Sequence, residues 1–94
     1  MLYGEGSAPS PKDAARWYSE AARDGFGPAQ LALGFLYLNG TGVMKDVGDA
    51  WAWFRAAESR DIAGALEVRK STGADFSPDV LRRAEELAAP RLKK

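Results

Sequence analysis

Carboxylates are the side chains of this 94-residue sequence that could carry acid–base chemistry, because it has thirteen aspartates and glutamates but no histidine and no cysteine. Paired carboxylates catalyse glycoside hydrolysis. Here, however, Asp13, Asp46 and Asp49 stand where aspartates cap helices or complement their dipoles. The glutamates fit solvated helix faces, namely Glu58, Glu67, Glu85 and Glu86. No nucleophile–base pair stands out, so we expect no enzyme and no catalytic residue.

Two short glycine motifs, at residues 4–6 and 40–42, resemble fragments of phosphate-binding loops. A dinucleotide fingerprint needs a preceding strand, and a P-loop needs its Gly-Lys-Ser/Thr ending. Neither is present, and glycines that tolerate positive φ suit a turn between paired helices. No EF-hand spacing appears, and thiolate zinc sites are excluded by the lack of cysteine. We therefore expect no cofactor and no metal.

The charge pattern excludes several classes of partner. Thirteen basic residues offset thirteen acidic ones, so no overall field draws the chain to nucleic acid or to an anionic membrane. Five basic residues gather near the C-terminus, where they complement a helix dipole: Arg82, Arg83, Arg91, Lys93 and Lys94. The aromatic residues fall at core spacing rather than among them, so we expect no nucleic-acid binding. No apolar run approaches the roughly 20 residues that span a bilayer, so we expect no membrane insertion.

The composition indicates one folded domain, with 46% hydrophobic and 11% aromatic residues. The N-terminal stretch, residues 1–11, lacks the basic and long apolar regions of a signal peptide. As written, the chain is expected to be cytoplasmic. A periplasmic or secreted location would follow if a longer precursor carried a signal, so the compartment stays open.

An internal repeat organises the chain at a spacing of 36 residues, the difference between positions 40 and 4. The aligned pairs are Gly4 with Gly40, Gly6 with Gly42, Asp13 with Asp49, Trp17 with Trp53, Tyr18 with Phe54, and Ala21 with Ala57. Repeats of about 20–50 residues are typical of solenoids, in which each unit buries its apolar face on its neighbours.

The capping and periodicity signals predict five helices and no strand. The expected ranges are 11–24, 27–38, 47–59, 62–70 and 78–88. We expect Ser10, Asp46, Asp61 and Ser77 to be the caps, and Gly25 to end the first helix. Gly34 should allow a neighbouring helix to approach closely, with alanines opposite it.

The segment LGFLYLNGTGVMKDVGDAWAWFRAA, residues 33–57, resembles the Sel-1-like repeat, a relative of the tetratricopeptide repeat. The resemblance implies an all-α solenoid of antiparallel helix hairpins, wound as a right-handed superhelix, that acts as an adaptor in protein assembly, as in bacterial relatives. It divides the chain into a partial repeat at 1–26, a full repeat at 27–60 and a degenerate capping repeat at 61–94. Met1 aligns with Tyr37, so we expect the C-terminal part of a longer array.

The resemblance also nominates binding residues. For the family's inner surface the candidates are Gln30, Leu31, Gly34, Phe35 and Leu38, which either receive a protein or peptide or fill contacts between units. We expect the repeat aromatics to anchor the core, including Trp17 and Tyr18. Because no complete helix precedes Gly4, these two residues could instead form an N-terminal edge that binds a partner or a second copy.

The function that follows is non-catalytic protein–protein interaction as an adaptor or scaffold. A regulatory or immunity-type protein that binds and occludes one specific partner is the alternative.

Overall fold

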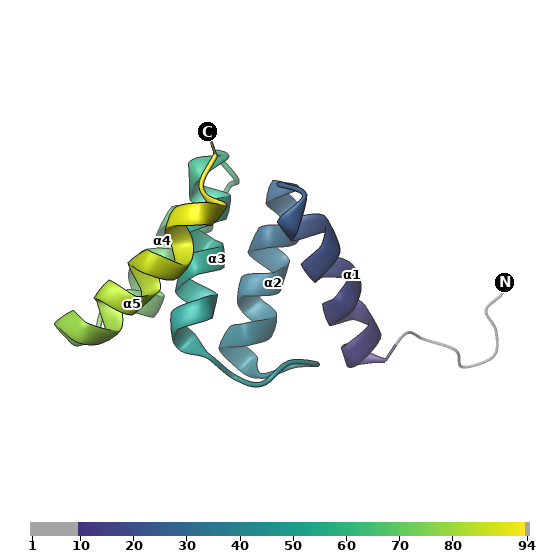
Figure 1. Ribbon diagram of the computed structural model, residues 1–94, viewed down its shortest axis with the longest axis horizontal. Helices are drawn as coiled ribbons and strands as arrows, with labels where there is room; N and C mark the ends of the chain where they lie inside the picture. Colours follow the sequence, from purple (N-terminus) through teal and green to yellow (C-terminus); the bar gives the residue numbers. More distant parts are fainter. Residues whose placement is uncertain (1–9, 94) are drawn as a thin grey trace, which may run out of the picture.

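The computed structural model describes residues 10–93, which form five α-helices and one turn of 3₁₀ helix (Figure 1). The elements are α1 (Pro11–Arg23), α2 (Gly27–Asn39), α3 (Val47–Ser59), α4 (Ala65–Gly73), α5 (Pro78–Ala88) and η1 (Ala89–Arg91). Within this range there is no strand, so the predicted all-α class and its five helices are confirmed. The first nine residues of the partial repeat, with their glycine loop, and residue 94 lie outside the described residues.

Three helices begin at the predicted caps. The Ser10 hydroxyl accepts a hydrogen bond from the Asp13 backbone at 3.2 Å and starts α1. One repeat later, the Asp46 carboxylate accepts from the Asp49 backbone at 3.0 Å and starts α3. Ser77 starts α5 in the same way. A short polar side chain that occupies an orphan backbone donor therefore fixes where each of these helices begins.

The beginning of α4 was predicted wrongly. Asp61 does not cap a helix, because its φ of 59° lies in the left-handed region. The chain turns instead, and α4 starts three residues later than Ile62, after Gly64 with its φ of 83°. Ile62 packs on the start of α2, where a Cβ added to Gly27 would stand 2.6 Å from the Ile62 Cδ1 atom. The turn is the C-terminal cap of α3, because Asp61 takes the left-handed position after the helix and the Ile62 N–H donates to the Ala57 carbonyl at 3.2 Å.

The central helix, α3, lies between α2 on one side and the α4–α5 pair on the other (Figure 1). Its alanines are fully buried and allow close helix packing. One core cluster joins Trp53 to small and aliphatic residues of α1 and α2, namely Ala22, Ala29 and Leu33. A second cluster joins Trp51 to Ala84 and Ala88 of α5. One helix thus supplies both halves of the core.

Trp51 has no counterpart in the first repeat, where Ala15 stands. Its indole is buried against α5 and lies beside Gly73, and the Arg69 guanidinium sits 5.6 Å from the centre of its ring. The residue therefore fills the contact between the full repeat and the C-terminal helices.

Long-range ion pairs attach the C-terminal segment to α3. Arg83 and Asp46 approach to 3.0 Å, and Arg91 and Asp49 to 2.9 Å. The sequence predicts that these arginines complement a helix dipole, and the structure shows in addition that both pair with carboxylates at the start of α3. The expectation of a solvated Glu58 was wrong, since it pairs with Arg69.

Candidate functional site

One face of α2 that is accessible to solvent carries three of the predicted binding residues, Leu31, Phe35 and Leu38, which we call the α2 surface. They recur at the i, i+4, i+7 spacing that places side chains on one helix face. Leu31 and Leu38 are half-buried, and Phe35 is 38% exposed. The Phe35 ring meets the buried Phe54 ring edge-on, with centroids 5.0 Å apart and planes at 66°. This contact holds an exposed aromatic side chain in a fixed position.

The other two predicted inner-surface residues, Gln30 and Gly34, lie beneath this surface. Gln30 is 1% exposed, donates to the Ala22 carbonyl at 3.0 Å and accepts from Arg60 at 3.3 Å. Gly34 lies against Phe54, so that an added Cβ would stand 2.5 Å from the ring. The close approach expected at Gly34 is present, but an aromatic ring faces it rather than alanines.

The predicted edge residues, Trp17 and Tyr18, are exposed by 64% and 41%. Their repeat equivalents differ sharply, since Trp53 is 6% exposed and Phe54 is 0% exposed. The difference arises because α2 covers Trp53 and Phe54, whereas α1 buries only its opposite stripe, including Ala22. The expectation that Trp17 and Tyr18 anchor the core was therefore wrong.

A pocket of about 450 Å³ lies between α1 and α3, with α2 as its floor and η1 at one end. Ser19 and Arg23 come from α1, Tyr37 from α2, and Asp49 and Trp53 from α3. Arg60, which follows α3, and Arg91 of η1 complete the polar lining. Sequence reasoning did not find this pocket, because four separate elements build it.

The η1 end of the pocket is formed by a stacked ion pair. The Arg91 guanidinium lies 4.2 Å from the centroid of the Trp53 ring and donates to Asp49 at 2.9 Å. Stacking of a guanidinium on an indole adds to the attraction of the pair. The nearby Tyr37 is half-buried, and burial together with the negative charge of Asp49 raises the pKa of its hydroxyl. Tyr37 is therefore a protonated donor at neutral pH.

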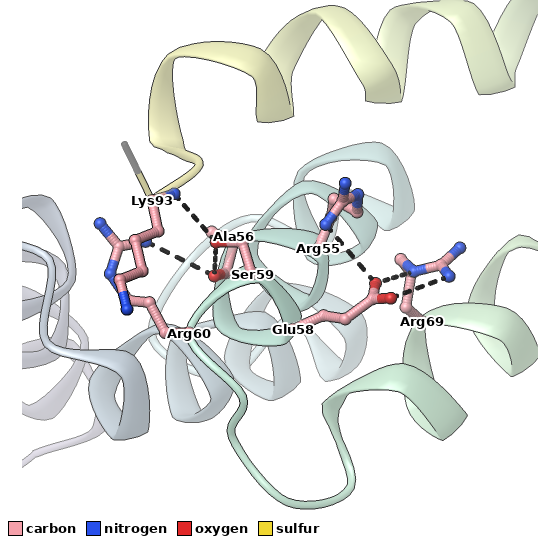
Figure 2. A network of polar contacts seen from close by, with 7 residues as sticks. All are labelled: Arg55, Ala56, Glu58, Ser59, Arg60, Arg69 and Lys93. Carbon is pink, nitrogen blue, oxygen red and sulfur yellow. Dashed lines mark hydrogen bonds and ion pairs between the residues drawn. The ribbon is translucent and has the colours of Figure 1, made fainter.

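Hydrogen bonds between side chains at the end of α3 and backbone groups hold the chain beyond η1 in place (Figure 2). The Ser59 hydroxyl accepts from the Lys93 backbone nitrogen at 3.0 Å and donates to the Ala56 carbonyl at 2.6 Å. Arg60 donates to the carbonyls of Arg91 and Ala56 at 2.9 and 3.5 Å. These contacts fix the wall of the pocket that η1 provides.

The described residues hold no group of three or more acidic, histidine or cysteine side chains arranged for a metal. No helix between residues 10 and 93 is long and apolar enough to cross a membrane. The described residues present an apolar helix face, an exposed aromatic edge and a polar pocket.

Comparison with known proteins finds a matching family model, a curated relative and a solved structure of similar fold. The family model described as Sel1 repeat matches residues 1–26 and 27–61. The chitin synthase regulator SKT5 of Malassezia restricta is 32% identical over 84 residues, which are 88% of this chain and 6% of that protein. A crystal structure of a protective antigen from uropathogenic Escherichia coli, displaying an SLR fold, matches with a TM-score of 0.83 and 35% identity. That match covers 87% of this chain and 18% of the antigen, so the chain spans a small part of both relatives.

Proposed function

This chain belongs to the Sel1 repeat family, and on that basis we propose that it is a non-catalytic adaptor or scaffold module that binds another protein or a peptide. The main observation behind the proposal is the α2 surface. Apolar side chains that recur on one face of a helix are the usual anchors for a docked peptide or partner helix. Phe35 is pre-positioned by Phe54, which lowers the ordering cost of binding.

The buried residues under the α2 surface support this role without touching the partner. Gln30 joins α2 to α1 and to Arg60, and Gly34 brings α2 close to Phe54. They hold the helix at a fixed depth, so the exposed side chains keep one arrangement. The relative named as a regulator of chitin synthase fits a role in binding rather than in catalysis.

The test is capture of a stoichiometric partner by the purified chain, followed by measurement of its affinity for variants. Phe35→Ala combined with Leu38→Ala should weaken binding and leave helicity intact. Val80→Ala is the matched control, because Val80 is 37% exposed on α5 and Phe35 is 38% exposed on α2. Equal affinity of the double variant and the control would remove the α2 surface from the proposal.

A second surface follows from the exposure of Trp17 and Tyr18. We propose that these residues receive a helix placed on α1 as α2 is placed on α3. Such a helix would come from another repeat or from a second copy of the chain, and it would carry a small residue opposite Tyr18, as Gly34 lies opposite Phe54. Sedimentation at increasing concentration tests the second copy. A chain that stays monomeric and binds no exposed-hydrophobe dye would contradict an uncovered apolar edge.

A further inference from the structure

The pocket between α1 and α3 has an excess of positive charge. Its lining includes three arginines, Arg23, Arg60 and Arg91, and one carboxylate, Asp49, so the formal charge is three minus one, or plus two. Asp49 and Arg91 neutralise each other at 2.9 Å. The excess therefore resides on Arg23 and Arg60.

Neither of these two guanidinium groups is balanced by a carboxylate among residues 10–93. Among residues 10–93, the Arg60 side chain donates three hydrogen bonds, all from its Nη1 atom to neutral oxygens, of Gln30, Ala56 and Arg91. Its Nη2 and Nε atoms donate to no oxygen in this part of the chain. Within the same range, the Arg23 side chain donates from Nε alone, to the Ser19 carbonyl at 3.3 Å in its own helix. Arg23 keeps both of its Nη groups for a ligand, and Arg60 keeps Nε and Nη2, which lie beside Gly25 in the turn between α1 and α2.

The other polar groups of the pocket add donors rather than acceptors. Tyr37 lines the pocket, its hydroxyl stays protonated at neutral pH because burial raises its pKa, and that hydroxyl has no hydrogen-bond partner in the described part of the chain. Both ends of the Gln30 amide are already hydrogen-bonded, the nitrogen to the Ala22 carbonyl and the oxygen to Arg60. The single carboxylate is occupied by Arg91. A ligand that matches this lining must accept hydrogen bonds and carry negative charge.

We propose that this pocket binds the carboxylate of an acidic segment of a partner protein, with Arg60 and Arg23 as the charged donors and Tyr37 as a neutral donor. A planar carboxylate matches the fork of a guanidinium group. The volume of about 450 Å³ accommodates a glutamate side chain with its adjoining backbone. This inference rests on the proposed protein-binding function and names the chemistry of the partner.

The probe is the peptide acetyl-Gly-Glu-Glu-Gly-amide, titrated into the full chain by calorimetry, with its Gln-Gln analogue as the comparison. We expect saturable binding of the glutamate peptide only. Arg23→Gln should weaken binding about tenfold, as expected for loss of one charge-assisted contact. Arg16→Gln is the matched control, because Arg16 lies on the same helix, pairs among residues 10–93 with the exposed Asp13 alone, and does not line the pocket. It should bind as the parent chain does.

Arg60→Lys provides a second variant that keeps the charge and removes the fork, and it should also weaken binding by a measurable factor. Equal binding of both peptides, equal effects of Arg16→Gln and Arg23→Gln, or saturation by inorganic phosphate or free glutamate in place of the peptide would each overturn the inference.

Failure of the pocket is distinguishable from failure of the proposed function. The Phe35→Ala and Leu38→Ala changes lie on a different face of α2 and should leave peptide affinity unchanged. If a natural partner binds the Arg23→Gln chain at full strength but loses affinity for the α2-surface variant, the pocket inference fails and the proposed function stands.

Discussion

The ring of Phe54 lies directly over Gly34, so closely that a methyl group in place of the glycine hydrogen would stand 2.5 Å from the Cε1 atom of the ring. This contact sets the distance between α2 and α3. It also supports the edge-on contact that positions Phe35 on the surface. Glycine has a low helix propensity, but its lack of a side chain at this position is what allows α2 and α3 to pack closely.

Gly34→Ala should destabilise the chain despite its better helix propensity. The propensity gain is about 1 kcal/mol, and overpacking a fully buried site costs about 1–3 kcal/mol. Urea unfolding followed by circular dichroism measures the balance. In a Phe54→Leu background, where the ring is absent, the cost of Gly34→Ala should shrink. An equal cost in both backgrounds would show that the Phe54 ring does not set the helix distance.

Trp53→Ala and Trp17→Ala should differ widely although the two positions are equivalent in the repeat. Removal of the buried Trp53 should cost about 3–5 kcal/mol of unfolding free energy. Removal of the exposed Trp17 should change it by less than about 0.5 kcal/mol. Chemical denaturation of both variants is the measurement. Equal losses would mean that Trp17 is packed in solution.

Gln30→Met should lower stability by about 1–3 kcal/mol, because it removes the donor to Ala22 and an acceptor of Arg60 while keeping the side-chain volume. Partner affinity per folded molecule should fall much less than in the Phe35→Ala and Leu38→Ala double variant, since Gln30 is buried and does not touch the partner. Thermal unfolding and a binding titration on the folded variant separate the two effects. Loss of affinity with unchanged stability would place Gln30 in the interface itself.

Asp46→Asn should make the free energy of unfolding depend less on pH in the acid range. The hydrogen bond from Arg83 holds the pKa of Asp46 below its ordinary value. A lowered pKa in the folded state stabilises the chain above the unfolded-state pKa, and this contribution is lost as pH falls through the folded-state pKa. Asparagine retains the cap but not the ion pair.

The stability difference between the parent chain and Asp46→Asn should therefore be present near neutral pH and shrink below about pH 4. Arg83→Gln should reproduce the same profile, because it removes the other half of the pair. A difference that stays constant from neutral to acid pH would contradict the role given to this pair.

Much of the fold was predictable because its signals are local. The caps at Ser10, Asp46 and Ser77 act within three residues of sequence, and the repeat spacing follows from matching residue types. The start of α4 was not predictable in this way. Asp61 is a good N-cap by residue type, but it takes the left-handed position that ends α3, where the Ile62 N–H donates to the Ala57 carbonyl, and Ile62 packs beside Gly27 of α2.

The candidate sites also combine local features, which the sequence predicts, with long-range packing, which it does not. The spacing of Leu31, Phe35 and Leu38 identifies a helix face, but it does not reveal which neighbours cover it. The exposure of Trp17 depends on the packing around α1, while the identical residue type at position 53 is buried. Likewise, the pocket depends on residues such as Arg91 and Asp49, which lie 42 positions apart and meet only in the folded chain.

Site-specific photo-crosslinking tests the central claim most directly. Benzoylphenylalanine placed at Phe35 should crosslink to a partner protein in cells, whereas the same group at the equally exposed Val80 should not. Crosslinking confined to position 35 is the result that an adaptor using its α2 surface predicts. Crosslinking at position 80 with none at position 35 would contradict it.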